Sequence, residues 1–597
     1  MAGQDRADGQ GLLTTVEDMA PPDTAAPAAQ SAAPDAPSTS TSTCTSDIRR
    51  VARDVFGWSD LQPGQAEAVA SVLAGHDTLV VMPTGSGKSA IYQIATQLLP
   101  GLTVVISPLV ALQEDQVASI ERRLGEEDAD DGDGQAVVIN ASRSSSAVCA
   151  AWEAVEDGSA RYVFLAPEQL ANEDVLDRLR AATVSLITVD EAHCVSSWGH
   201  DFRPDYLVLG EVVDQLGHPP VLALTATGSA PVRAEILERL HMTDPTVMAH
   251  GFDRPNLRLE VVRHEDDAQK REAVVAQVAE IAGAGILYVA TRAETEEYAT
   301  ALQDRGRAAA AYHAGMRAAD REAVHTSFID GSVDVVVATT AFGMGIDKPD
   351  VRFVAHADVP ESVDAYYQEI GRAGRDGEPA VATLHYRQAD LGLRRFFAAG
   401  SPKPATLRAV FEGVPAGSTL RRSQLAEASG LTARTATRAA NALVEADALV
   451  DDEEGLRRAD GPAGASADAA AAAAAEQAAE REQVEQSRIA MMQQFAETRG
   501  CRRQFLLGYF GDELDHPCGN CDTCSAGTAY DDATTAADGA HDAEWPPESA
   551  VEHAEWGSGT VMSTEEDRIT VFFPAAGYRV LALADIREHE LLRRVPA

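Results

Sequence analysis

A glycine-rich loop after an apolar run is the first stretch of the sequence whose residue types could do chemistry. Glycines let backbone N–H groups close on a polyphosphate, and a helix that starts after the loop points the positive end of its dipole at the anion. A lysine at the end of such a loop reaches the β- and γ-phosphates, and a hydroxyl beside it can hold Mg²⁺. Met82 stands where the full G-x-x-x-x-G-K-[ST] pattern has glycine, so an ordinary strand–turn–helix is the alternative. The residues predicted to contact the phosphates are Thr84, Gly85, Ser86, Gly87, Lys88 and Ser89.

A second apolar run, Ser185–Val189, ends in two acids, Asp190 and Glu191. The carboxyl end of a buried strand is where a phosphate-loop enzyme holds its metal ion, and a second acid beside the first can orient the attacking water. Both signals in this order favour a site that binds and hydrolyses a nucleoside triphosphate.

Two arginines, Arg372 and Arg375, lie further along the chain, with glycines beside them that clear space. We expect them on one helical turn, where two guanidinium groups suit the charge that develops on a γ-phosphoryl group. A plain pair of surface arginines is the alternative.

An aromatic ring and an amide precede the glycine loop. Trp58 offers a ring that can stack on adenine, and Gln65 offers a paired donor and acceptor for the edge of the base. A core tryptophan and a helix-capping glutamine are the alternative, and they would be preferred if this segment stood alone.

Four of the seven cysteines are clustered in the later part of the chain. Three share one C-x-x-C-x-x-C stretch and the fourth precedes it, which supplies the four thiolates of a closed tetrahedral Zn²⁺ site. An iron–sulfur cluster is the competitor, because this spacing also suits its ligation. An odd number of unevenly spread cysteines argues against a disulfide framework. The predicted zinc ligands are Cys501, Cys518, Cys521 and Cys524.

The elements that must position these residues follow from the hydrophobic pattern. Short apolar runs alternate with helical stretches around the glycine loop, and again from Gly285 onward. This alternation predicts two α/β lobes built on parallel sheets, with ligands outside the carboxyl ends of the strands. We expect a disordered tail at 1–46, a first lobe at 47–245 and a second lobe at 246–400.

The rest of the chain divides into smaller units. Residues 401–460 have the pattern of a helix-turn-helix with a short wing, a winged-helix-like insert, and 461–479 are an Ala-rich linker or helix. We expect a helical zinc-binding module at 480–528, an acidic linker at 529–546 and a small SH3-like β-barrel at 547–597.

The second helix of the helix-turn-helix has two unlike faces. Arg434 and Arg438 fall on the side opposite its small apolar residues and could meet DNA phosphates. Four consecutive acids, 451–454, occupy the wing, where DNA would repel them. We therefore expect the insert to contact the DNA backbone, and we do not expect its wing to separate the strands. A structural spacer is the alternative. The residues expected to pack inward are Ala436, Ala439, Ala440 and Leu443.

Bulk properties narrow the class of protein. With 597 residues the chain can form several domains. The net charge of −44 counts against a nucleic-acid partner, but the acids are concentrated in stretches typical of solvated loops, and arginine pairs recur elsewhere. No apolar run could span a bilayer and the N-terminus lacks a signal-peptide pattern, so we expect a cytoplasmic protein.

The motifs in this order resemble those of superfamily-2 helicases. Two segments resemble the RecQ family of DNA helicases in particular: Trp198-Gly199-His200-Asp201-Phe202-Arg203-Pro204 after the two acids, and Gln368-Glu369-Ile370-Gly371-Arg372-Ala373-Gly374-Arg375-Asp376-Gly377 later. The resemblance covers roughly residues 48–395 and resumes at about 484–525. It implies two RecA-like lobes with ATP between them, a structural Zn²⁺ and ATP-driven 3′→5′ unwinding of DNA.

The resemblance also implies a role for each motif residue. Trp58 would stack on adenine, Gln65 would read its edge, and Glu191 would be the general base. Arg375 would reach across the cleft as an arginine finger. The residues implied to hold Mg²⁺ are Ser89 and Asp190. The implied catalytic set is Lys88, Asp190, Glu191, Gln368, Arg372 and Arg375.

DNA is the implied partner, as single strands and duplex junctions. A loop with Trp198, His200, Phe202 and Arg203 would link single-strand binding to hydrolysis. The expected setting is repair, recombination or replication in association with the nucleoid. An RNA-directed DEAH-type ATPase and a non-unwinding DNA-bound scaffold are the alternatives.

Two regions depart from the RecQ pattern. A winged helix normally follows the cysteine cluster in that family, whereas the candidate here precedes it. The C-terminal barrel resembles the Tudor-like module of UvrD-type helicases instead, which implies a protein partner.

Overall fold

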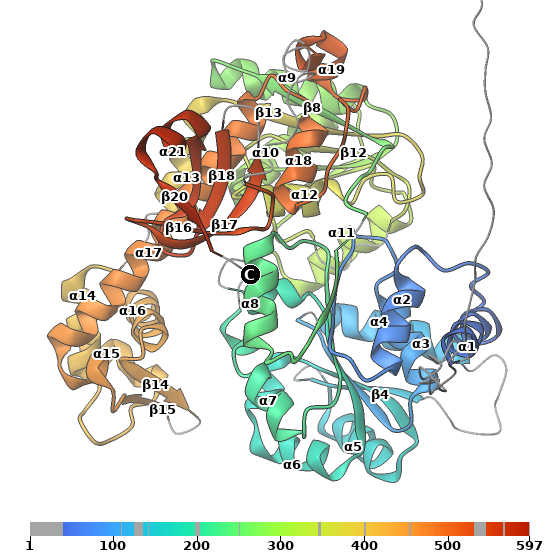
Figure 1. Ribbon diagram of the computed structural model, residues 1–597, viewed down its shortest axis with the longest axis vertical. Helices are drawn as coiled ribbons and strands as arrows, with labels where there is room; N and C mark the ends of the chain where they lie inside the picture. The colour runs from blue at the N-terminus through green and yellow to red at the C-terminus, as the bar shows by residue number, and fades with distance from the viewer. Residues whose placement is uncertain are drawn as a thin grey trace, which may run out of the picture. The chain divides into compact units, whose positions relative to one another are not determined.

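A computed structural model describes most of the chain (Figure 1). The described residues are 40–108, 110–124, 135–140, 143–196, 203–249, 251–343, 348–398, 402–452, 455–530, 545–564 and 568–595. A helix, α1, spans Ser40–Asp54, so helical structure begins within the stretch that composition assigned to a disordered tail.

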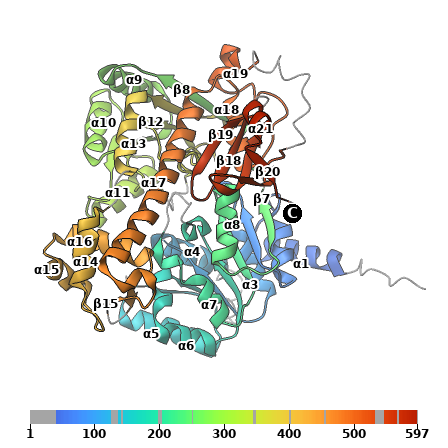
Figure 2. The same ribbon diagram turned by 60° about the vertical axis from the view of Figure 1, so that its left-hand side comes forward.

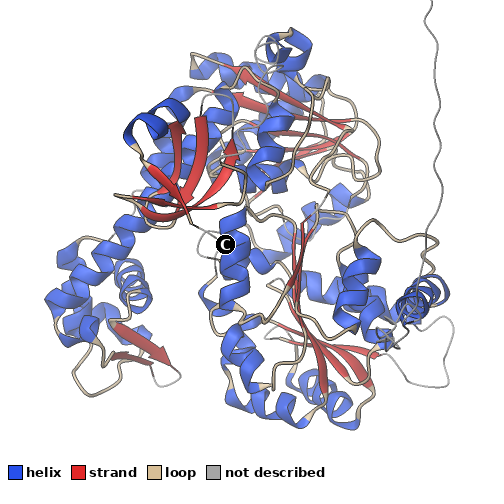
Figure 3. Ribbon diagram, viewed as in Figure 1, coloured by secondary structure: helices blue, strands red, loops and turns tan. Residues whose placement is uncertain are grey.

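Two parallel sheets carry the motif residues (Figure 3). The first has seven strands in the order β3 (Gln135–Ile139), β4 (Ala160–Leu165), β2 (Leu102–Ile106), β5 (Val184–Val189), β6 (Val221–Thr225), β1 (Thr78–Val81) and β7 (Thr246–Ala249). Helices accompany it: α2 (Gln65–Leu73), α3 (Ser89–Leu98), α4 (Val110–Leu124), α5 (Ser145–Asp157), α6 (Glu173–Ala181), α7 (Leu209–Gln215) and α8 (Ala230–Arg239). Strands β1, β2 and β6 are buried along their whole length, as parallel strands covered on both faces are. The glycine loop follows β1 and the two acids follow β5, and only β6 lies between these two strands. The loop and the acids therefore lie near each other at the carboxyl ends of the strands.

The second sheet has six parallel strands, in the order β10 (Ala309–Tyr312), β11 (Val335–Ala338), β9 (Ala284–Tyr288), β12 (Val351–His356), β13 (Ala380–Tyr386) and β8 (Leu257–Arg263). Its helices are α9 (Asp267–Glu280), α10 (Arg292–Asp304), α11 (Ala318–Ile329), α12 (Val363–Ile370) and α13 (Leu391–Ala398). The prediction of two RecA-like parallel-sheet lobes is confirmed.

The first sheet extends beyond the boundary expected at residue 245. β7 pairs in parallel with β1, with Thr78 opposite Thr246 and Val81 opposite Ala249. The strand therefore belongs to the first lobe, because its backbone hydrogen bonds complete the edge of that sheet.

The insert between the second lobe and the cysteines has its own core. It comprises α14 (Pro404–Gly413), α15 (Leu425–Ser429), α16 (Ala433–Glu445) and the antiparallel pair β14 (Leu449–Asp452) and β15 (Gly455–Arg458). Thr432 caps α16 by accepting from the N–H of Thr435 at 3.3 Å, and Gly430 makes the preceding turn with φ of 67°. The expected inward face is confirmed, since the buried residues of α16 are Ala436, Ala439, Ala440 and Leu443.

One long helix, α17 (Ala467–Glu497), joins this insert to the zinc-binding module (Figure 2). Its first half packs in the core of the insert through Ala470, Ala471 and Ala474. Its second half packs in the core shared with the second lobe through Met492 and Phe495. The Ala-rich stretch is thus the beginning of a continuous helix, because Ala favours helix and no Gly or Pro interrupts it.

The last two units follow α17. The zinc-binding module contains α18 (Arg502–Phe510) and α19 (Asp522–Ala526), and Cys521 pairs with Leu259 beside the edge of the second sheet. The C-terminal module, residues 545–595, is an antiparallel sheet in the order β19 (Gly577–Ala582), β18 (Arg568–Phe573), β17 (Gly557–Thr564), β16 (Ala550–His553) and β20 (Leu592–Arg594), with α21 (Leu583–His589). Among the helices of the described residues, none has the length and apolarity needed to cross a membrane.

Candidate active site

The glycine loop, residues 82–89, connects β1 to α3 and uses the left-handed backbone that glycine adopts freely. Gly85 has φ of 82° and Gly87 has φ of 74°. A Cβ on Gly87 would lie 2.8 Å from Nε2 of Gln65, and a Cβ on Gly85 would lie 3.0 Å from Cδ of Arg375. The space beside each glycine is therefore taken by a side chain from another segment.

Gln65 is bonded to this loop. Its amide nitrogen donates to the main-chain oxygens of Ser86 at 3.0 Å and Gly87 at 2.9 Å. Its side-chain oxygen accepts from the N–H of Gln62 at 2.9 Å. The buried amide thus fixes the shape of the loop in this structure, a role that the sequence did not suggest.

The indole of Trp58 contacts two neighbours. The ring of Phe56 stacks on it at 4.7 Å between centroids, and the Arg123 guanidinium lies 5.0 Å from its centroid. Arg123 also donates to the main-chain oxygen of Phe56 at 2.8 Å. A base that stacks on Trp58 has to share the indole with these groups.

Lys88 lies among charged groups at the start of α3. Its Nζ donates to the main-chain oxygens of Met82 at 3.1 Å and Pro83 at 3.4 Å. Burial lowers the pKa of Lys88, and the Glu191 and Asp190 carboxylates partly oppose this effect. A bound polyanion would stabilise the charged form of this lysine.

The two acids after β5, Asp190 and Glu191, lie side by side and are largely buried. Burial, and then the neighbouring Glu191 carboxylate, raise the pKa of Asp190 to about 7. The N–H of Glu191 donates to Oδ1 of Asp190 at 3.0 Å, and the backbone of Glu191 has a left-handed φ of 48°. A divalent cation fits this place, because its charge would favour the deprotonated form of Asp190. Ser89, the first residue of α3, and Asp190 are the residues that would hold Mg²⁺.

His193 links the acids to the end of β6. Its Nδ1 lies 3.4 Å from Oε2 of Glu191 and 3.1 Å from the hydroxyl of Thr225. That hydroxyl donates to the main-chain oxygen of Thr227 at 2.7 Å, so it accepts a hydrogen bond from the Nδ1–H of the histidine. The segment after β6, which contains Thr227, is therefore connected to the two acids through hydrogen bonds of Thr225 and His193.

The arginine pair lies past the end of α12, on turns. The helix ends at Ile370, and the next bonds are short-range ones, from the N–H of Arg372 to O of Glu369 and from the N–H of Ala373 to O of Ile370. The expected helical turn is thus replaced by tighter turns that begin at the glycine after Ile370.

Both guanidinium groups reach other segments. Arg372 is buried and donates to the main-chain oxygen of Gly343. Arg375 lies against Gly85 of the glycine loop, where a glycine leaves room for its side chain. Gln368 is buried within α12. The second lobe thus brings Arg375 to the phosphate loop of the first lobe.

Two residues that the sequence interpretation missed hold the arginine-bearing turn. Arg254 donates to the main-chain oxygens of Ala373 at 2.8 Å and Gly374 at 2.9 Å. Asn256 donates to the main-chain oxygen of Gly374 at 2.8 Å. Arg503 of α18 donates in turn to the main-chain oxygen of Arg254 at 3.0 Å. These polar contacts have no periodic signature, so they emerge only in three dimensions.

The aromatic-rich loop is described only at its end. Trp198, His200 and Phe202 lie outside the described residues. Arg203 donates through NH1 to the main-chain oxygen of Pro108 at 3.0 Å. Because Pro108 follows β2, this end of the loop is anchored at the edge of the sheet that carries the two acids.

The four cysteines converge as the zinc prediction requires. Their ligand atoms all lie within 4.8 Å of one another, and Sγ of Cys518 is 3.9 Å from Sγ of Cys524. A tetrahedral ion with Zn–S bonds of about 2.3 Å places its sulfurs about 3.8 Å apart. Burial raises the pKa of Cys524 to about 11, so thiolates at this spacing need a cation. The donor set fits one Zn²⁺ better than an iron–sulfur cluster, because a cluster divides the four thiolates among two or four irons and holds thiolates on different irons further apart.

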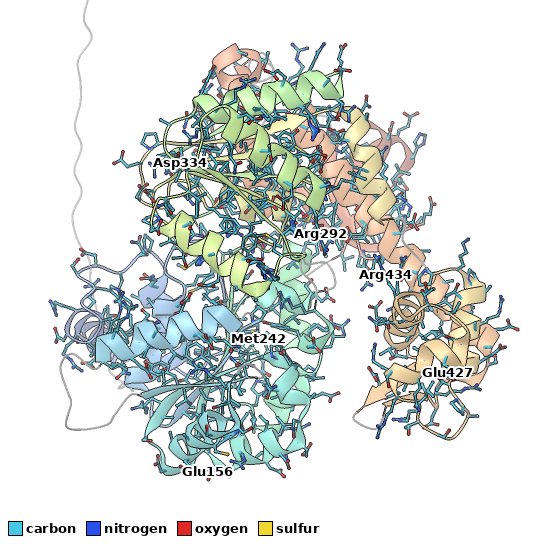
Figure 4. The ribbon with its side chains drawn as sticks, turned by 180° about the vertical axis from the view of Figure 1, so that it is seen from behind. Glu156, Met242, Arg292, Asp334, Glu427 and Arg434 are labelled. Atoms are coloured by element: carbon cyan, nitrogen blue, oxygen red, sulfur yellow. The ribbon has the colours of Figure 1, made fainter. Side chains whose placement is uncertain are left out.

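The two arginines of the insert are exposed on α16, where Figure 4 labels Arg434. Asn441, on the same side, accepts from Arg422 at 2.8 Å, and Arg422 also pairs with Asp451 of the wing at 2.6 Å. Residues 453 and 454 of the acidic wing lie outside the described residues. One acid of the wing is therefore neutralised by a neighbour within the insert.

Comparison with known proteins places the two lobes in a class. Residues 62–235 match the family described as DEAD/DEAH box helicase, and residues 269–377 match the helicase conserved C-terminal domain. Residues 549–587 match a protein family of unknown function, DUF3553. Together with the glycine loop, the two acids and the arginine turn, these matches show that the two lobes are of the helicase kind.

The zinc-binding module and the relatives narrow the class further. Residues 465–525 match the RecQ zinc-binding family. The ATP-dependent DNA helicase RecQ of Pasteurella multocida (strain Pm70) is 34% identical over 79% of this chain, which spans 61% of that relative's length. The probable ATP-dependent DNA helicase RecS of Bacillus subtilis (strain 168) is 38% identical, over 57% of this chain and 66% of its own. The chain belongs to the RecQ family.

Likeness to solved structures is weaker. The DUF1998 helicase MrfA, in a crystal structure bound to DNA and AMPPNP, has a TM-score of 0.47 and 17% identity to this chain. The match covers 57% of this chain and 50% of that one.

The metal assignment gives a direct prediction. Purified protein is expected to contain one zinc per chain and no visible absorption, because Zn²⁺ is d¹⁰ and redox-silent. Cys521→Ser should release the zinc and lower the midpoint of thermal unfolding, since the free energy of metal binding contributes to folding. Elemental analysis and a melting curve measure both effects. Cys149→Ser, at an exposed cysteine, is the control. A brown protein that contains iron would contradict the assignment.

Proposed function

We propose that this protein is an ATP-dependent DNA helicase of the RecQ kind, which moves 3′→5′ and unwinds DNA in repair and recombination. The observation that carries the proposal is the approach of Arg375 to Gly85, because it completes a phosphate site from two lobes. RecQ relatives at about one-third identity support the DNA substrate. The chain spans only 61% of the length of one such relative, so activity, substrate and partners are argued from the site.

In this proposal the glycine loop holds the ATP phosphates and Lys88 moves from its main-chain oxygens to the β- and γ-phosphates. Glu191 accepts the proton of the attacking water, and Arg375 stabilises the charge that develops on the γ-phosphoryl group. Bound Mg²⁺ would supply charge neutralisation at the phosphates, with Ser89 and Asp190 as its holders. Arg372 keeps the turn in place through its bond to Gly343 rather than by reaching phosphate.

Base recognition follows from the same segment. Trp58 supplies the stacking surface, while Gln65 shapes the glycine loop and turns toward adenine only if it releases Ser86 and Gly87. Trp198, His200 and Phe202 would sense single-stranded DNA, and the anchored Arg203 would pass that signal to the edge of the sheet.

The C-terminal module would bind a protein partner. Val580 and Val595 of this module are exposed, at 36% and 41%, and offer apolar surface to a partner. With DNA as substrate, the protein would work in association with the nucleoid.

Strand displacement tests the proposed reaction. Duplexes with a 3′ or a 5′ single-stranded tail, made of DNA or of RNA, are incubated with full-length protein and ATP. Unwinding of 3′-tailed DNA alone is the expected outcome. Preference for RNA would favour an RNA-directed ATPase, and ATP hydrolysis without displacement would favour a DNA-bound scaffold.

The catalytic assignments separate binding from turnover. Lys88→Ala should lose ATP binding, because the phosphates lose their cation. Glu191→Gln and Arg375→Ala should bind ATP but hydrolyse it roughly a hundredfold or more slowly, the scale of lost transition-state stabilisation. ATP binding by calorimetry and phosphate release measure the two quantities. Normal turnover in either of the last two variants would remove the mechanism.

The insert gives a salt-dependent prediction. If Arg434 and Arg438 each contact one phosphate, the double change Arg434→Ala/Arg438→Ala weakens duplex binding and reduces the slope of log affinity against log salt by about two. ATPase on saturating single strands should not change. Arg408→Ala, which breaks an exposed ion pair with Asp468 on the same insert, is the control. An unchanged slope would assign α16 to packing.

A further inference from the structure

A buried chain of hydroxyl groups crosses four parts of the molecule. Ser229 precedes α8 in the first lobe, Tyr578 is in β19 of the C-terminal module, Tyr509 is in α18, and Asp364 is in α12 of the second lobe. The contacts are 3.2 Å from Ser229 to Tyr578, 2.9 Å from Tyr578 to Tyr509, and 2.5 Å from Tyr509 to Asp364. None of the four residues is more than 7% exposed.

The direction of these hydrogen bonds is set by the carboxylate at one end. Tyr509 donates its one proton to Oδ2 of Asp364, so it accepts from Tyr578. Tyr578 has then used its own proton and accepts from Ser229. Burial, and then the charge of Asp364, raise the pKa of Tyr509, which keeps this donor protonated. A chain of donors that all point to an ion is stronger than separate neutral bonds.

Both ends of the chain belong to segments of the proposed ATP site. Ser229 comes two residues after Thr227, whose main-chain oxygen receives the Thr225 hydroxyl bonded to His193. Asp364 lies in α12, which leads directly into the turns that carry Arg375. A shift of one lobe against the other would therefore stretch this chain of bonds.

A second set of contacts joins the same parts. Arg233 of α8 is buried, pairs with Glu548 of the C-terminal module, and donates to the main-chain oxygen of Phe510 at 3.3 Å. Gly577, the first residue of β19, lies so close to α17 that a Cβ would stand 2.8 Å from Cβ of Ser487. The C-terminal module is thus packed against the first lobe and against α17 and α18, and these two helices connect it to the second lobe.

We propose that the C-terminal module is an intramolecular latch that holds the two lobes in the arrangement in which Arg375 meets the glycine loop, with Tyr578 as its positioning residue. The inference rests on the ATPase activity proposed above. When the latch is broken, the fraction of protein in the closed arrangement falls, and the apparent affinity for ATP falls with it.

Full-length protein with Ser229→Ala, Tyr578→Phe or both changes tests the latch in a DNA-stimulated ATPase assay. Ser229→Ala, which removes one hydrogen bond of the chain, should raise KM for ATP roughly two- to tenfold, and Tyr578→Phe, which removes two, should raise it at least as much; kcat should stay within about twofold. The double variant should match Tyr578→Phe, because that change alone already removes the bond from Ser229. Arg593→Ala, which breaks an exposed ion pair with Glu552 in the same module, is the control and should behave as the unchanged protein.

Several outcomes would overturn the latch. They are an unchanged KM in both single variants, a fall in kcat at constant KM, and additive effects in the double variant; the last two would assign Tyr578 to general packing. If Tyr578→Phe does not fold, Ser229→Ala still tests the latch. The Ser229 side chain makes no capping hydrogen bond to α8, so its removal should leave this helix intact. If the protein without substitutions has no ATPase activity, that result would instead contradict the proposed function.

Discussion

The contact between Arg375 and Gly85 is the interaction on which the rest of the structure depends. A cation from one sheet can stand beside the phosphate loop of another only where that loop has no side chain, and Gly85 provides this gap. The contact also requires the carboxyl ends of the strands in the first sheet to face the amino ends of β12 and β13 in the second, where the N–H of Gly374 donates to the main-chain oxygen of Val351. Each sheet alone offers half of a site, so any element that sets their relative position acts on the chemistry.

Three such elements come from outside the two sheets. The segment with Arg254 and Asn256 fixes the main chain of the arginine turn, and Arg503 of the zinc-binding module fixes that segment. Cys521 lies beside Leu259 of β8, the edge strand of the second sheet. The segment with Arg254 and Asn256 leads directly into β8, so this strand supports both that segment and the four cysteines. A zinc ion held by the four cysteines would thereby help to support the turn that carries Arg375.

The parts of the site that could be predicted from the sequence are those encoded by local pattern. The glycine loop and the two acids each form within a few residues, three of the four cysteines share one short stretch, and the apolar face of α16 follows from a period of 3.6. Other contacts join residues that are tens to hundreds of positions apart. They are the hydrogen bonds of Gln65 to the glycine loop, those of Arg254 to the arginine-bearing turn, and the chain of hydroxyl groups through Tyr578. Polar contacts of this kind leave no periodicity, and β7 was assigned to the wrong lobe because a short edge strand carries little signal of its own.

The unbroken helix α17 has a mechanical consequence. Its 31 residues make a rod about 46 Å long, anchored at one end in the second lobe and at the other in the insert. A tilt of about 10° at the anchored end displaces the far end by about 8 Å. A small rotation of the second lobe would therefore move α16 by several ångströms, a distance comparable to the axial rise of about two base pairs, although the insert carries no residue of the proposed ATP site.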